Sequence, residues 1–141
     1  MAVAREVLVL QATVTPDFAS QSGLIDDAFG VPSYAPSRVA HVLGRLQAAM
    51  ATLRMLPWRD WDIDRQIDVR WTYANAERLA RELDAECLYR HRPAAWLEPL
   101  GNNLINLLTW APGRADAVAA VTASIVPMVD EMAAQIGRAH V

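Results

Sequence analysis

The 141-residue sequence lacks lysine and contains a single cysteine, Cys87. All 13 basic residues are arginines, they are outnumbered by acidic residues, and the formal net charge at pH 7 is −3. This balance gives no reason to expect a nucleic-acid partner or an anionic membrane. A lone cysteine excludes an internal disulfide and leaves the compartment unknown, the cytoplasm being slightly favoured.

Long apolar runs are also missing. No run approaches the ~18 residues of a membrane span, so the sequence predicts no transmembrane helix. The apolar N-terminal run is interrupted by Arg5 and Glu6 and has no basic segment before it, so it predicts no signal peptide. Apolar residues still form 53% of the chain, which fits a well-buried domain or a part of a larger one.

The sequence shows no sustained two-residue alternation of apolar side chains, and its periodicity is helical. We predict an all-α fold of about five to six helices in an irregular antiparallel array, the N-terminal fragment of a larger helical protein. The clearest helix begins after Pro36, with Ser37 as its expected N-cap, and stops at Pro57. Its apolar stripe consists of Val39, Val42, Leu43, Leu46, Met50, Leu53 and Leu56.

Other helices flank this one. Residues 3–13 are predicted to end a first helix, and 15–36, rich in Pro, Gly, Ser and Asp, to form a long irregular connection. A further helix is expected over about 63–89. Its apolar residues, among them Ile67 and Trp71, do not lie on one stripe, so it should contact different neighbours along its length or bend.

The last third predicts two more helical segments. One runs through Leu100 to Trp110 and is followed by a turn at "APG". Pro127 is expected to kink the final helix or to split it in two.

The last residues, "IGRAHV" at 136–141, do not continue the pattern of that helix. The DNA string ATC-GGA-AGA-GCA-CAC-GTC, the start of a widely used short-read sequencing adapter, translates into these six residues. We therefore expect 136–141 to be adapter read-through, and 1–135 to be the N-terminal helical region of a larger domain. The alternative is a natural, frayed C-terminus.

No catalytic constellation is recognisable, and we assign no catalytic, cofactor-binding or metal-binding residues. Asp60, Asp62 and Asp64 alternate as in a calcium loop. An EF-hand would need Gly and Glu where Arg65 and Trp71 stand, so we interpret these aspartates as helix-capping and solvated charges.

Other candidate residues are interpreted as structural. His41 and His91 lack ligand-spaced partners for zinc, and Cys87 is expected to be a buried, inert thiol. An enzyme that uses Cys87 is a third, minor alternative. The tryptophans expected in the core are Trp58, Trp61 and Trp71. The asparagines expected to make interhelical hydrogen bonds are Asn75, Asn102 and Asn103.

The order of these features resembles a bacterial family, the domain of unknown function numbered 885, whose members are all-helical and look like gluzincin-type zinc metallopeptidases. Pro16, Ala19 and Gly23 match its P-x-x-A-x-x-x-G spacing. The other similar stretches are "RQIDVRWTYANAERLARELD", "RPAAWLEPLGNNLINLL" and "VTASIVPMVDEMAAQI". The resemblance covers nearly all of 1–135, but only the N-terminal third or less of the family.

The family's zinc-binding H-E-x-x-H helix does not occur in this sequence. The resemblance therefore implies a scaffold or one wall of a substrate cleft, inactive by itself. It also implies zinc and a peptide-like substrate for the full-length parent, with the C-terminal catalytic part of its own chain as partner. Whether the chain is an enzyme stays uncertain. The alternative is a complete small helical protein–protein interaction module, whose apolar surface binds a partner.

Overall fold

Residues 2–21, 30–110 and 113–139 are described by a computed structural model, and within these ranges every regular element is a helix. The predicted all-α fold is confirmed, with six helices of nine or more residues in the described ranges. These are α1 (Ala2–Val14), α3 (Pro36–Met55), α4 (Ile63–Arg81), α5 (Ala94–Trp110), α6 (Ala115–Ala123) and α7 (Ile125–Ala139). The shorter elements are α2 (Asp17–Gln21) and the turns η2 (Trp58–Asp60), η3 (Glu82–Glu86) and η4 (Leu88–Arg90).

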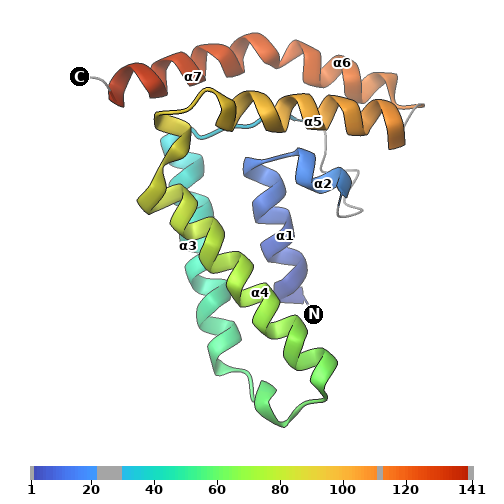
Figure 1. Cartoon of the computed structure of the whole chain (residues 1–141), viewed down its shortest axis with the longest axis vertical. Coiled ribbons are helices and arrows are strands. Elements are labelled where there is room, and N and C mark those ends of the chain that lie inside the picture. Colours follow the sequence, from blue (N-terminus) through green and yellow to red (C-terminus); the bar gives the residue numbers. More distant parts are fainter. Residues whose placement is uncertain (1, 22–29, 111–112, 140–141) are drawn as a thin grey trace.

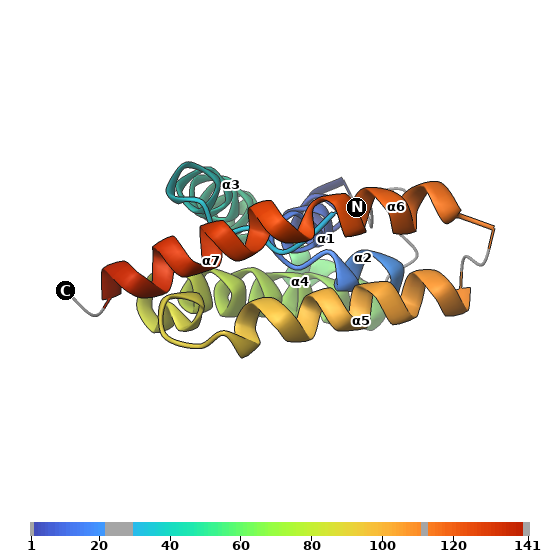
Figure 2. The same ribbon diagram turned by 90° about the horizontal axis from the view of Figure 1, so that it is seen from above.

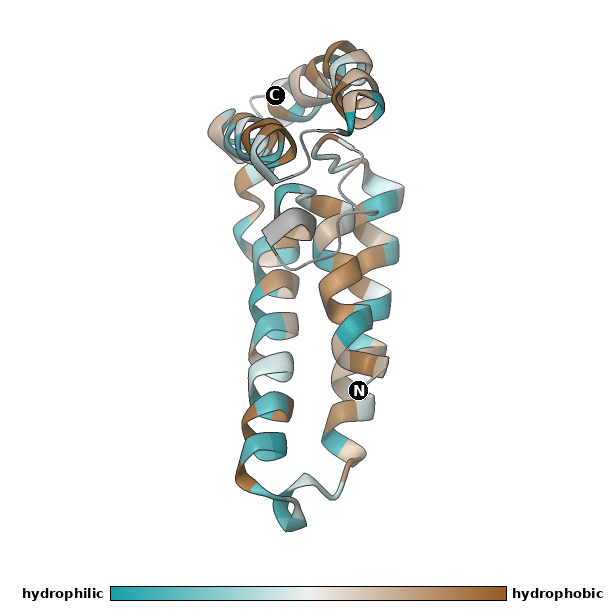
Figure 3. Ribbon diagram, turned by 90° about the vertical axis from the view of Figure 1, so that its right-hand side faces the viewer, coloured by the Kyte–Doolittle hydropathy of each residue, from teal (hydrophilic) through white to brown (hydrophobic). Residues whose placement is uncertain are grey.

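The helices form two parts, which we call the arm and the head. The arm is the long antiparallel hairpin of α3 and α4, joined through η2, with α1 packed against both (Figure 1). The head consists of α5 and, antiparallel to it, α6 and α7, and it lies across one end of the arm (Figure 2). From the side, the head helices are seen nearly end-on above the arm (Figure 3). α2 contacts both α1 and α5 and so links the two parts.

α3 follows the sequence pattern closely, although its start differs from the prediction. Val39, Val42, Leu46 and Leu53 are buried, and the helix ends before Pro57, as predicted. The N-cap residue is Ala35, without a side-chain hydrogen bond, and Ser37 is exposed. Pro36 occupies the first helical turn, where its fixed φ favours the helix and its missing N–H leaves no bond unmade.

The prediction for α4 needs a correction, because its buried residues do form one stripe. Ile67 and Trp71 are 56% and 54% exposed, and they lie on the outer face. Thr72 concealed the pattern, because it is polar in the sequence. Its hydroxyl donates to the Asp68 carbonyl (2.7 Å), so the side chain is buried without an unmet hydrogen bond. The buried stripe consists of Val69, Thr72, Ala76, Leu79 and Leu83.

α4 also ends earlier than the predicted residue 89. Its last turn widens into the π-helical turn η3, and Cys87 then adopts a left-handed conformation with φ of 46°. The Cys87 N–H donates to the Glu82 carbonyl (3.0 Å), which closes the helix end. The chain turns into η4 and reaches α5 from there, so the predicted change of neighbours occurs at this end.

The connection predicted over 15–36 is irregular only in part. Residues 17–21 form α2, whose first turn begins with Asp17. Residues 30–35 are irregular as predicted, whereas 22–29 lie outside the described residues. The same holds for 111–112 of the predicted "APG" turn, of which Gly113 is described and lies in a turn.

The final helical segment is split in two, as Pro127 predicted. α6 ends at Ala123 and α7 begins at Ile125, so that Pro127 lies in the first turn of α7. A proline there removes no helical hydrogen bond, because the first N–H groups of a helix have no partner within it. α7 includes residues 136–139, which leaves their predicted origin as adapter read-through untested.

By length and composition alone, residues 115–138 resemble a membrane-spanning helix, contrary to the expectation from the sequence. The apolar window is only 17% buried. The segment is weak evidence for a membrane, because it is broken at Ser124 and because α7 carries Asp130, Glu131 and Arg138. We therefore identify no clear membrane span in the described ranges.

Candidate functional site

A cavity of about 430 Å³ lies where α1 and α2 meet the end of α4 and the start of α5, and we call it the cleft. Its volume falls in the range of small-ligand pockets. The lining combines apolar side chains with a few polar ones from distant parts of the chain. The apolar lining residues are Val14, Phe18, Leu79, Leu83, Leu88, Ala95 and Pro99. The polar ones are Gln11, Thr15, Asp17, Tyr34, Arg78, Glu82 and Tyr89.

A chain of hydrogen bonds holds Arg78 at the edge of the cleft. Asn75 donates to Gln11 of α1 (Nδ2 to Oε1, 2.9 Å), which confirms its predicted interhelical bond. Arg78 donates to Asn75 Oδ1 (2.9 Å) and to Glu82 Oε1 (2.6 Å). A partly exposed ion pair of this spacing adds only about 0.5 kcal/mol to stability. Its main effect is to fix the guanidinium in one orientation.

Asp17, at the start of α2, contributes a partly buried carboxylate to the lining of the cleft. Burial raises the pKa of Asp17 above its ordinary value of 3.8. Hydrogen bonds from the Asn102 side chain and the Phe18 backbone offset part of that rise. Asn102 lies on α5 and Asp17 begins α2, so this pairing agrees with the interhelical role predicted for Asn102. A carboxylate with a raised pKa in a cleft is a frequent feature of binding sites.

Aromatic side chains form the floor of the cleft. The Tyr34 ring stacks on Tyr89 (4.6 Å between centroids) and meets Trp96 edge-on (4.8 Å). Trp96 donates from Nε1 to the Tyr89 carbonyl (2.8 Å), and the Tyr34 hydroxyl donates to the Ala95 carbonyl (3.3 Å). Burial raises the pKa of Tyr34, so its hydroxyl stays protonated and acts as a fixed donor.

The segment before α3 is held in place by α7. Glu131 accepts hydrogen bonds from the Ser33 hydroxyl (2.9 Å) and the Tyr34 N–H (2.7 Å). Gln135 donates to the Tyr34 carbonyl (3.1 Å). The position of Tyr34 in the cleft therefore depends on residues about a hundred positions further along the chain.

The three aspartates of the alternating motif lie at the far end of the arm, away from the cleft. Asp62 caps α4, and its Oδ1 accepts from the Arg65 N–H (3.0 Å), which confirms the capping interpretation for that residue. His41 and His91 are exposed. In the described part of the chain, no three His, Cys, Asp or Glu side chains gather as a metal site requires. Zinc in a full-length parent stays a prediction.

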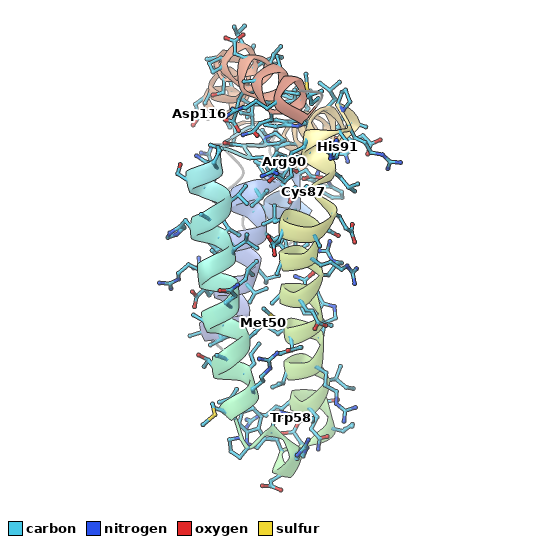
Figure 4. The ribbon with its side chains drawn as sticks, turned by 90° about the vertical axis from the view of Figure 1, so that its left-hand side faces the viewer. Met50, Trp58, Cys87, Arg90, His91 and Asp116 are labelled. Carbon is cyan, nitrogen blue, oxygen red and sulfur yellow. The ribbon has the colours of Figure 1, made fainter. Side chains whose placement is uncertain are left out.

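Cys87 is only partly buried, which corrects the expectation of a buried thiol. Its Sγ donates to the Leu83 and Asp84 carbonyls (3.3 and 3.0 Å). The left-handed backbone at this residue turns the chain at the surface, near Arg90 and His91 (Figure 4). Neither hydrogen bond supplies a base that would activate the thiol.

The prediction for the tryptophans is wrong. Trp58 and Trp61 are partly exposed and Trp71 is more than half exposed, so none belongs to the core. The fully buried tryptophan is Trp96. The spacing in the sequence indicates its burial. The buried face of α5 recurs at steps of four, three and four residues, through Trp96, Leu100, Asn103 and Leu107.

Asn103 is buried, and its Nδ2 donates to the Gly30 carbonyl (3.0 Å). This bond ties α5 to the segment before α3.

The outer side of α5 carries a second feature, an apolar surface that we call the α5 face. Ile105 and Leu108 are each 62% exposed, and Leu97, on an earlier turn of the same side, is 48% exposed. Trp110, 70% exposed, lies on another side of the helix. Clustered exposed side chains of this kind are typical of surfaces that bind another polypeptide.

The cleft can bind and orient a small ligand. Asp17 and Glu82 offer carboxylates to an ammonium or N–H group, Arg78 offers donors to a carboxylate or carbonyl, and the aromatic floor offers apolar contact. Comparison with protein families, curated proteins and solved structures found no match to this chain, so its site is interpreted from its own geometry.

Proposed function

We propose that this chain is the helical scaffold of a metallopeptidase-like hydrolase and that the cleft forms one wall of its substrate site. The observation that carries the proposal is the cleft itself, with two carboxylates and an oriented guanidinium around an apolar floor. The resemblance described for 1–135 supports the class of enzyme. Zinc would be held by a part of the parent that carries the H-E-x-x-H helix.

The lining suits a short peptide-like ligand. Arg78 is fixed by Asn75 and Glu82, so binding a ligand carboxylate or carbonyl needs little further ordering of its side chain. The Asp17 carboxylate complements a ligand N–H or ammonium group. The cavity of about 430 Å³ accommodates a ligand of a few residues at most.

A binding titration tests this role. The probe is the dipeptide alanyl-leucine, followed by NMR, with its N-acetylated amide as a control ligand that lacks both charges. Arg78→Gln should weaken binding of the dipeptide at least tenfold. Arg81→Gln is the matched control on the same helix, since Arg81 pairs with Glu86 outside the cleft and should leave binding unchanged.

Two results would contradict the proposal: no saturable binding by the folded chain, or equal effects of the two variants. The proposal also expects the purified chain to hold no stoichiometric zinc and to hydrolyse no peptide. A tightly bound zinc ion per chain in a metal assay would overturn that part.

The second candidate function is a small helical interaction module, and the α5 face favours it. A complete module should unfold cooperatively as a soluble monomer or dimer, whereas a scaffold that lacks its partner should bind a hydrophobic dye and aggregate. If the chain is a scaffold that lacks its partner, Leu108→Glu on the α5 face should abolish the binding of the hydrophobic dye. Light scattering and dye fluorescence therefore distinguish the two.

A further inference from the structure

A second cavity, of about 260 Å³, lies at the tip of the arm, and we call it the tip pocket. It is formed by the end of α3, η2 and the first half of α4. Trp58 marks its position, at the opposite end of the arm from Cys87 and His91 and hence far from the cleft (Figure 4). The lining residues are Leu53, Arg54, Trp58, Val69, Arg70 and Tyr73.

Arginines stack on both aromatic rings of the tip pocket. The Arg70 guanidinium lies over the Trp58 ring, 5.2 Å from its centroid, and Arg59 lies over the same ring at 5.3 Å. Arg54 lies over the Tyr73 ring at 5.2 Å and donates to the Tyr73 hydroxyl. Stacking occupies the flat face of a guanidinium and leaves N–H donors along its edge available to a ligand.

Among the residues that the structure describes, these arginines have no acidic partner. In the described ranges, Arg54, Arg59 and Arg70 have no carboxylate within 4.0 Å, whereas Arg65 nearby pairs with Asp62 (3.3 Å). Residues 54–70 contain four arginines and four aspartates, so the tip as a whole has no net charge. Because the charges of the tip cancel, a ligand is not attracted from a distance and must be recognised through direct contacts. The nearby aspartates disfavour a dianion such as phosphate.

We propose that the tip pocket binds a single carboxylate that carries an apolar group, as the C-terminal residue of a peptide does. Arg70 and Arg54 meet the carboxylate, because a guanidinium edge matches a carboxylate with two parallel hydrogen bonds. Leu53 and Val69 form an apolar base, and the Trp58 and Tyr73 rings form the walls for the side chain. The volume fits one residue and not a longer segment. This site is separate from the cleft and does not depend on its proposed function.

The test is a titration of the whole chain with N-acetyl-leucine, followed through the NMR signal of the Trp58 indole N–H. The control ligand is N-acetyl-leucine amide, which has the same apolar group and no carboxylate. The acid should bind saturably, and the amide should bind at least tenfold more weakly. Inorganic phosphate should not displace the acid at comparable concentration.

Variants assign the binding to the two lining arginines. Arg70→Gln and Arg54→Gln should each reduce affinity for the acid at least tenfold, and Arg70→Lys should restore only part of it, because an ammonium lacks the forked geometry. Arg59→Gln is the matched control, because Arg59 stacks on the same Trp58 ring but does not line the tip pocket. Its affinity for the acid should stay within about twofold of that of the unchanged protein. A tenfold change in affinity corresponds to ~1.4 kcal/mol.

Equal binding of acid and amide would overturn the proposal, as would equal losses from Arg59→Gln and Arg70→Gln. If inorganic phosphate displaced bound N-acetyl-leucine at a comparable concentration, the tip pocket would be a general anion site, and the proposed ligand would be wrong. Circular dichroism establishes that each variant is folded. If Arg70→Gln unfolds the arm, Arg54→Gln and the pair of ligands still decide the outcome.

Discussion

The arm and the head differ in where their contacts come from along the chain. In the arm, α3 and α4 follow one another through η2 and pack side by side, with α1 against both. In the head, α5 and α7 are fixed by residues near the start of the chain: Asn103 bonds to Gly30, and Glu131 bonds to Ser33 and Tyr34.

The chemistry of the contacts differs as well. The arm is held by aliphatic stripes, with Leu46 and Leu53 among its fully buried side chains. The head depends on a buried tryptophan and on charged or amide groups that bond to backbone atoms. Contacts between aliphatic side chains are not directional, so they can form with different neighbouring side chains. A buried hydrogen bond requires its donor and acceptor in one relative position, because an unmet polar group is costly. We infer that the head is the more specific part and the arm the more self-sufficient one.

Trp96→Ala should have the largest effect, because it removes a fully buried ring and the hydrogen bond to the Tyr89 carbonyl. We expect a loss of about 3–5 kcal/mol in the free energy of unfolding, a large part of the total stability of a domain of this size. Leu46→Ala, the comparison in the arm, should lose about 2–5 kcal/mol. Urea denaturation measures both. A loss below that of Leu46→Ala would contradict the role of Trp96 as the centre of the junction.

Glu131→Gln should have the next largest effect and should separate the two parts. It removes the charge that strengthens the bonds from Ser33 and Tyr34, at a cost of about 1–3 kcal/mol. Hydrogen exchange should become faster for the amides of α7 and for Tyr34, while α3 and α4 keep their protection. Asp130→Asn, an exposed neighbour on α7, is the control and should change little. Faster exchange throughout the arm would show that the two parts unfold together.

Asp62→Ala should affect the arm alone and by less. The substitution removes the cap on the Arg65 N–H and should destabilise the start of α4 by about 1 kcal/mol. Amide exchange in the first turn of α4 measures it, with Asp64→Ala as the control because Asp64 is not the N-cap residue. Equal effects of both substitutions would mean that charge, and not capping, stabilises this turn.

Asp17→Asn should have the smallest effect, visible mainly as a change in pH dependence. The pKa of Asp17 is raised in the folded state, so folding favours its protonated form. That contribution is fully present below pH 3.8 and is lost as the pH rises through the folded-state pKa. Asp17→Asn should remove this decline. Asp116→Asn is a control of opposite sign, since a hydrogen bond from Arg114 lowers the pKa of Asp116. Unfolding curves between pH 3 and 7 measure both slopes.

Local sequence patterns predicted elements of both the arm and the head. In the arm, the α3 stripe and its stop at Pro57 could be found from spacing and from one proline. In the head, Pro127 correctly indicated the split between α6 and α7. The prediction failed for α4, where Thr72 occupies a buried position, because a hydroxyl that bonds to its own helix is compatible with the core although it reads as polar.

The cleft could not be predicted in the same way. Its polar residues Asp17, Tyr34 and Arg78 lie far apart in the sequence and share no spacing. The partly exposed Trp58 and the buried Trp96 are equally hydrophobic. The four- and three-residue steps from Trp96 to Leu107 indicate which face of α5 is buried, and the packing of α5 on the segment before α3 decides what covers it.

The sequence by itself determined the helical class, the main helix boundaries and the modest net charge, because periodicity, proline and composition act locally. The tertiary structure decided which face of α4 is buried, which tryptophan joins the head to the arm, and which residues meet in the cleft and in the tip pocket. Those outcomes depend on contacts between segments up to about a hundred residues apart. Such contacts form only when the whole chain can bury its apolar faces together and satisfy its polar groups at once.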